Sequence, residues 1–125
     1  MREAYQSDLR HIVDDLIDMS ELVGTALEDA TRALLEGDLA LAERVVTADP
    51  HIDARQLELD AKAVELLARQ SPVATDLRLL VATLRMSSSL ERMGDLAAHV
   101  ALTARRAHPD PAVPAQHREQ IQRMS

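Results

Sequence analysis

The sequence predicts an all-α protein, an antiparallel up-down bundle of three long helices. Apolar residues recur at steps of three and four along most of the chain, which is the spacing of one helix face. The composition is rich in Ala, Leu, Glu and Arg and includes only three glycines, and strand patterns are nearly absent. Turn residues at Gly37 and at Ser71-Pro72 then divide the chain into three segments of similar length.

The composition limits the size and kind of the core. A chain of 125 residues fits one domain with a modest single core. Hydrophobic residues make up 46% of it, but there is no Phe or Trp and only one Tyr. The core is therefore expected to be aliphatic.

The first helix is predicted to end at Glu36, because Gly37 supplies a stop and Asp38 is a suitable N-cap for the next helix. Its apolar face follows three- and four-residue steps through Leu9, Ile12, Leu16, Met19, Val23, Ala26, Ala30 and Ala33.

The second helix is predicted from about Asp38 to Arg69 and contains Pro50, which removes a backbone donor and crowds the preceding turn. Two local conformations of the chain are compatible with a proline at this position. The helix either continues with a kink, or it stops at Ala48 and restarts with Asp49 as cap and Pro50 as first helical residue. A kinked, broadly continuous helix is favoured, since the apolar stripe resumes in nearly the same direction.

The third helix is predicted to start after Ser71, the expected N-cap, with Pro72 at the first helical position, and to run to about Ala107. Short connections make neighbouring helices antiparallel. The bundle would then occupy residues 1–107, followed by a proline-rich linker over 108–114. Residues 115–125 resemble the start of a further repeat.

The charge and the motifs that are missing exclude several functions. A net charge of −7 argues against general affinity for nucleic acid or anionic lipid. The sequence has no cysteine, no signal segment and no apolar run long enough to cross a bilayer, which fits a cytoplasmic protein with at most a peripheral membrane role. Phosphate-binding loops, nucleophile elbows and Glu-x-x-His motifs do not occur. Nothing singles out His11, His51 or His99 as a phosphotransfer residue, so a non-enzymatic role is expected.

Two pairs of carboxylates carry the most specific signal. Asp49 and Asp53 are four residues apart, as are Glu91 and Asp95, so each pair lies on one helix face. Residues equally distant from the turn near Pro72 lie at the same height of an antiparallel hairpin. This places Asp49 level with Asp95 and Asp53 level with Glu91.

Four carboxylates at one height repel each other unless a cation or a proton intervenes. Carboxylate oxygens suit magnesium, calcium, manganese and iron, and do not exclude zinc. The competing interpretation is a solvated face, or pairing with arginines such as Arg55 and Arg92. The same reasoning about the turn at Gly37 places Glu21 level with Asp53, as a further candidate ligand. His99 is either another ligand or a surface histidine.

At these positions the sequence resembles the PhoU family of phosphate-signalling proteins. The matching elements follow in order: Asp49-x-x-Ile52-Asp53, Gln70-x-Pro72-Val73-Ala74-x-Asp76-Leu77-Arg78, Leu90-Glu91-Arg92-Met93-Gly94-Asp95-x-Ala97 and Val100-Ala101. The sequence departs from the family pattern at His99, where the family commonly has Asn, and at Pro50, which interrupts the first acidic motif.

The resemblance implies a PhoU-like bundle, spectrin-like in outline, and family members typically carry two such bundles in tandem. This chain is similar to the first bundle and the start of the second. The resemblance implies a metal site of iron, zinc, manganese or magnesium held by Asp49, Asp53, Glu91 and Asp95.

It also implies a negative regulator of the phosphate-starvation response, acting through the ATPase of a phosphate transporter and a sensor histidine kinase. A homodimer is expected. The alternative is a helical dimerisation or docking module without a metal role.

Overall fold

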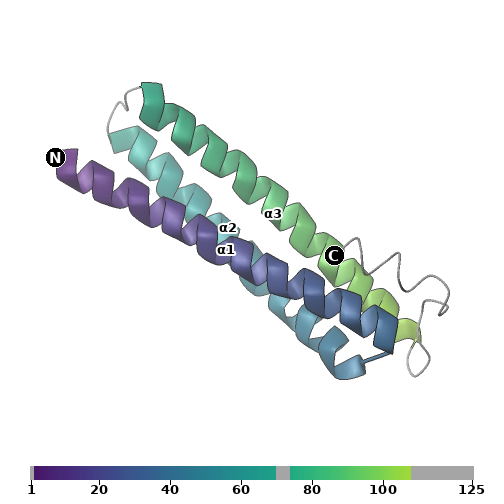
Figure 1. Cartoon of the computed structure of the whole chain (residues 1–125). Helices are drawn as coiled ribbons and strands as arrows, with labels where there is room; N and C mark the ends of the chain where they lie inside the picture. The colour runs from purple at the N-terminus through teal and green to yellow at the C-terminus, as the bar shows by residue number, and fades with distance from the viewer. Residues whose placement is uncertain (1, 70–73, 108–125) are drawn as a thin grey trace.

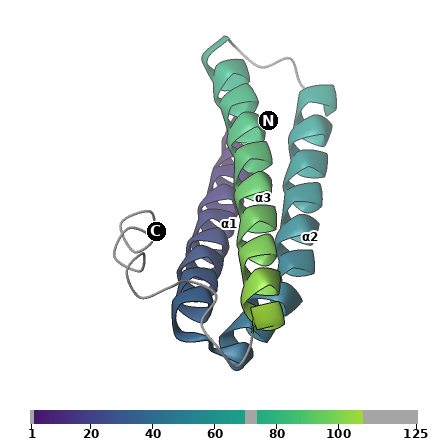
Figure 2. The ribbon, with the colours of Figure 1, turned by 90° about the vertical axis from the view of Figure 1, so that its right-hand side faces the viewer.

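The computed structural model describes residues 2–69 and 74–107, and they form three helices (Figure 1). These are α1 (Arg2–Glu36), α2 (Leu39–Arg69) and α3 (Ala74–Ala107). Every pair of helices is in contact, α2 runs antiparallel to the other two, and no strand occurs in these ranges (Figures 1 and 2). The predicted all-α three-helix bundle is confirmed. The proposed N-cap Ser71, the linker over 108–114 and the repeat start over 115–125 lie outside the described residues.

The connection between α1 and α2 follows the predicted stop and cap. Gly37 has φ 66°, which an L side chain rarely adopts, and the Asp38 amide donates to the Ala33 carbonyl over 3.2 Å. The Asp38 carboxylate then accepts a hydrogen bond from the Leu41 amide over 3.1 Å. This tight turn makes α1 and α2 antiparallel neighbours.

Pro50 lies inside α2, which continues without a break from Leu39 to Arg69. The continuous helix is therefore the correct one of the two predicted forms, and the restart at Asp49 is wrong. Packing of the stripe on both sides of Pro50 accounts for this, because Val45 and Ile52 are both buried in one cluster.

The core divides into two clusters along the bundle. One lies toward the α1–α2 connection and is rich in alanine, with Met19, Val45 and Ile52 among its larger members. The other lies toward the opposite end and includes Tyr5, Leu59 and Leu80. The whole predicted face of α1, from Leu9 to Ala33, is buried. The core is aliphatic as expected, apart from Tyr5.

Several large apolar residues that mark α2 and α3 in the sequence do not face this core. The exposed ones among them are Leu39, Val64, Leu77, Val81 and Met93. On α3 the buried face instead carries small or polar side chains such as Thr83, Ser87 and Ala97. Small residues on this face let the helices approach closely. The larger side chains named above lie on the surface. No helix among the described residues is apolar over enough length to cross a membrane.

Candidate metal centre

The predicted acidic residues gather between α2 and α3. Asp49, Asp53 and Asp95 each contribute a carboxylate oxygen, and these three oxygens lie within 4.8 Å of one another. The three side chains are partly buried. The antiparallel register thus brings residues that are distant in sequence within reach of a single ion.

Gly94 allows α3 to approach α2 at this height. A Cβ atom at Gly94 would lie 3.3 Å from Ile52 Cγ2 and 3.8 Å from Asp49 Oδ1. The first distance is tighter than an ordinary van der Waals contact, so a larger residue would push Ile52 or the helix away. Ile52 itself is buried in the alanine-rich cluster. The acidic group therefore rests directly on the core.

Glu91 belongs to the same electrostatic group. Its pKa is raised, first because its carboxyl hydrogen-bonds with that of Asp95, then by burial, and then by the negative charges of Asp95, Asp53 and Asp49. The raised pKa means that Glu91 holds its proton more tightly than an isolated glutamate does.

Asp49 is held in an unfavourable environment for a charged carboxylate. Burial raises its pKa, the charges of Asp53 and Asp95 raise it further, and the neighbouring His99 lowers it. The Oδ1 atoms of Asp49 and Asp53 are both buried and accept no hydrogen bond from the described residues. Leaving such an atom unsatisfied costs about 1–3 kcal/mol.

No described lysine or arginine offsets this cost by an ion pair. Within residues 2–69 and 74–107, no lysine or arginine forms an ion pair with Asp49, Asp53, Glu91 or Asp95. Arg92 instead donates to Ser89 Oγ over 3.3 Å, and Arg55 lines a groove between α1 and α2. The alternative of pairing with Arg55 and Arg92 is therefore not what the structure shows.

The geometry fits a hard cation. Ligand oxygens lie about 2.0–2.6 Å from magnesium or calcium, so opposite ligands of one ion are separated by at most about 5 Å. The 4.8 Å grouping of the three aspartate oxygens meets this limit. A bound cation would also give the buried Oδ1 atoms of Asp49 and Asp53 the partner that the protein does not supply.

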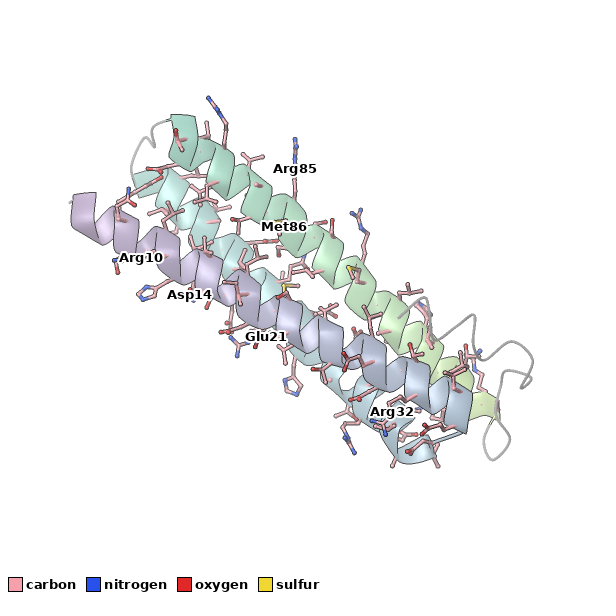
Figure 3. The ribbon with its side chains drawn as sticks, in the orientation of Figure 1. Arg10, Asp14, Glu21, Arg32, Arg85 and Met86 are labelled. Carbon is pink, nitrogen blue, oxygen red and sulfur yellow. The ribbon has the colours of Figure 1, made fainter. Side chains whose placement is uncertain are left out.

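The two additional candidates are placed differently. Glu21 lies on α1 (Figure 3). It lines a groove between α1 and α2 together with Asp18, Arg44 and Arg55. It is not among the residues whose oxygens gather at Asp49. His99 is exposed on α3, close enough to Asp49 for its charge to affect the pKa of that carboxyl.

A further acid in the contact of α2 with α3 escaped the sequence reasoning. Ser87 Oγ donates to Asp60 Oδ1 over 3.4 Å, and burial raises the pKa of Asp60 although this hydrogen bond lowers it. A signal was present, because Asp60 follows Asp53 by seven residues and Ser87 precedes Glu91 by four. Both spacings keep the new pair on the helix faces that carry the acidic group.

Fold and site together define a long-helix bundle with an acidic site between two of its helices. The chain belongs to the PhoU family, because the model described as "PhoU domain" matches residues 16–104. This range includes all four acidic residues. The resemblance noted in the sequence is thereby confirmed.

Named relatives support the same assignment. The chain is 46% identical over 114 residues to "Phosphate-specific transport system accessory protein PhoU homolog 1" of Mycobacterium leprae, covering 91% of this chain and 51% of that protein. It is 45% identical over 114 residues to "PhoU homolog 2" of Mycobacterium bovis, covering 91% of this chain and 54% of the relative. A PhoU homolog of Deinococcus radiodurans is 38% identical over 101 residues, with 81% and 47% covered. The chain thus spans about half the length of these curated relatives. No solved structure gives a significant match.

Proposed function

We propose that this chain is a metal-binding regulatory adaptor of phosphate uptake rather than an enzyme. One observation carries the metal role: three aspartates converge between α2 and α3, two of their oxygens are buried without a partner, and no lysine or arginine pairs with them among the described residues. The ligands are Asp49, Asp53 and Asp95, with Glu91 as the fourth. The family supports the phosphate context.

The mechanism is neutralisation coupled to folding. Asp49, Asp53, Glu91 and Asp95 would hold a cation of the iron, zinc, manganese or magnesium type. Its charge would offset the repulsion between these carboxylates, and it would give the buried oxygens of Asp49 and Asp53 a partner. Because the carboxylates come from α2 and α3, such an ion would hold the two helices together and stabilise the surface that they present. A ligand that binds only the folded state stabilises it by about 2.7 kcal/mol at a concentration one hundred times its Kd.

The names of the relatives, which describe accessory proteins of a phosphate transport system, support a partner in such a system. The adaptor acts in the cytoplasm on the ATPase subunit of a phosphate transporter and on a sensor histidine kinase. It restrains the phosphate-starvation response and reaches the membrane only through these partners. The adaptor works as a homodimer.

Thermal melting in chelator-treated buffer tests the metal role. Added manganese, iron(II) or zinc should raise Tm by several degrees in the wild type, since about 1 kcal/mol corresponds to 4–8 °C in a domain of this size. Asp49→Asn with Asp95→Asn should abolish the rise. Asp14→Asn with Asp18→Asn, which removes two exposed acids of α1, is the matched control and should retain it. Equal behaviour of both double variants would refute the ligand assignment.

A reporter of the phosphate-starvation response tests the regulatory role. The experiment uses a bacterium that lacks its own PhoU protein. Expression of the wild type should lower the reporter in phosphate-rich medium, and the Asp49→Asn, Asp95→Asn variant should restrain it less. No repression by a well-expressed wild type would contradict the adaptor function, whatever the metal result.

A docking module without a metal role is the second candidate, and the exposed apolar residues of α3 favour it. It predicts that the two asparagine substitutions stabilise the protein, because they remove repulsion between carboxylates, and leave repression intact. Elemental analysis of the purified protein separates the two candidates directly.

A further inference from the structure

The outer face of α3 carries an apolar row with the spacing of a coiled-coil seam. Leu79, Met86, Met93 and Val100 follow one another at intervals of seven residues. Leu79 is 41% exposed, Met86 54% and Met93 42%, while Val100 is half-buried. Between them lie Ala82, Ser89 and Leu96, which are also exposed. We name these seven residues the α3 seam.

A basic row runs beside the seam with the same interval. It contains Arg78, Arg85, Arg92 and Arg106, with His99 at the intervening step. All five side chains are exposed, and Arg85 points away from the bundle (Figure 3). We name Arg78, Arg85, Arg92 and Arg106 the arginine row. A seven-residue repeat keeps both rows on one side of the helix, as in coiled coils.

The arginine row has no acidic partners among the described residues of the bundle. In the described part of the chain, no carboxylate forms an ion pair with any of its four arginines. The neighbouring Arg105 differs, since it approaches Glu43 of α2 at 3.5 Å. The protein has a net charge of −7, so a row of four arginines that form no ion pair with a described carboxylate is a local exception.

We infer that the α3 seam and the arginine row together dock one amphipathic helix of a partner protein, whose apolar stripe is flanked by aspartate or glutamate. The seam runs from Leu79 to Val100, which are 21 residue steps apart, or about 32 Å along the helix. Apolar residues at heptad spacing fit the matching stripe of a second helix, and flanking charges set partner choice. The arginine row therefore selects an acidic flank.

Two other occupants fit the charges less well. An antiparallel second copy of α3 would bring arginine row against arginine row, which is repulsive. A parallel copy would have to set its arginines beside Thr83, Leu90 and Ala97, but Thr83 and Ala97 are buried in the bundle and Leu90 packs against its core, so these positions are not open to a second copy. An anionic membrane would attract the arginine row but repel the protein as a whole, because its net charge is −7.

Peptide binding tests this inference, in chelator so that the result does not depend on the metal site. The probe is a fluorescent synthetic helix of about four heptads, with leucine at the first and fourth positions and glutamate at the flanking fifth and seventh. A matched probe carries lysine in place of glutamate. Fluorescence anisotropy should show binding of the glutamate probe to the wild type, weakened by salt, and at least about tenfold weaker binding of the lysine probe.

Variants locate the surface and test the charge. Met86→Glu with Met93→Glu should lose the glutamate probe, while Leu57→Glu with Val64→Glu, two exposed apolar residues of α2, should keep it. Arg85→Glu with Arg92→Glu should lose the glutamate probe and gain the lysine probe. Arg10→Glu with Arg32→Glu on α1 is the charge-matched control and should change neither. Circular dichroism verifies that each variant is folded.

Four outcomes would overturn the inference. The first two are that the wild type does not bind the glutamate probe, or that it binds both probes equally well. The third is that the α2 or α1 control variants lose binding of the glutamate probe as the α3 variants do. The fourth is that the wild type is a dimer and that Met86→Glu with Met93→Glu dissociates it. Vesicles rich in phosphatidylglycerol provide the last comparison. If the protein binds vesicles through the arginine row and binds no peptide, the occupant is a membrane surface instead.

Discussion

Gly94 and Gly24 are two helical glycines in different environments. A Cβ atom at Gly94 would meet Ile52 and Asp49, whereas nothing lies within 4 Å of a Cβ atom at Gly24. Glycine inside a helix costs about 1 kcal/mol relative to alanine. At Gly94 this cost is offset by the close approach that places Asp49 near Asp95.

The two glycines give a matched pair of variants. Gly24→Ala should raise the free energy of unfolding by about 0.5–1 kcal/mol, because helix propensity improves and no contact is disturbed. Gly94→Ala should gain less, since Ile52 must move by a few tenths of an ångström. Gly94→Val should lower the free energy of unfolding by about 1–3 kcal/mol and weaken metal binding. Urea denaturation measures these changes, and equal gains for both alanine variants would contradict the close-packing role.

At the scale of single residues, Asp60 also gives a prediction of how stability depends on pH. Burial raises its pKa above 3.8, so the folded state holds this proton more tightly than the unfolded state does. Protonated Asp60 therefore favours the folded state, and this contribution to the free energy of unfolding is lost as the pH rises through the raised pKa. Asp60→Asn should be more stable than the wild type at neutral pH, and the difference should shrink below about pH 4. Melting curves across this range measure it, and a constant difference would contradict the assignment.

At the scale of elements, the connection between α1 and α2 depends on two residues with different roles. Gly37 has the positive φ that ends α1, and Asp38 caps α2 through the Leu41 amide. This joint sets the antiparallel direction of α2 and hence the height of Asp49 and Asp53. The joint between α2 and α3 lies outside the described residues.

Substitutions at this joint should destabilise the bundle by predictable amounts. Asp38→Ala should cost about 1 kcal/mol, because it removes an N-cap acceptor, and Asp38→Asn should cost much less. Gly37→Ala should cost about 1–2 kcal/mol, because the left-handed conformation is unfavourable for an L residue. Chemical denaturation measures both, and an unchanged midpoint for Gly37→Ala would contradict the strain argument.

At the scale of the whole molecule, the bundle leaves much apolar surface uncovered. Eleven large apolar side chains are exposed among the described residues. These side chains belong to neither of the two buried clusters that form the core. Exposed apolar surface on this scale is typical of proteins that bind other proteins.

Self-association is the corresponding prediction. Sedimentation velocity of the 125-residue chain should show a dimer or a larger oligomer at micromolar concentration. The Met86→Glu, Met93→Glu variant should keep the same oligomeric state, since the α3 seam is assigned to another partner. A monomer across the accessible concentration range would contradict the proposed homodimer.

Local patterns in the sequence determined the three helices, the end of the first at Glu36 and the height at which the acids lie. Helical periodicity, the Gly37 stop and the i, i+4 spacing of Asp49 with Asp53 and Glu91 with Asp95 act within a few turns, so they can be read without the fold. Only the tertiary structure decided the rest. It placed Glu21 in a groove between α1 and α2 and allowed α3 to approach α2 at Gly94. It also buried two aspartate oxygens that have no hydrogen-bond partner among the described residues, and it left the α3 seam exposed. These outcomes depend on the rotation of each helix about its own axis and on the distance between neighbouring helices. Small residues on all three helices together determine both.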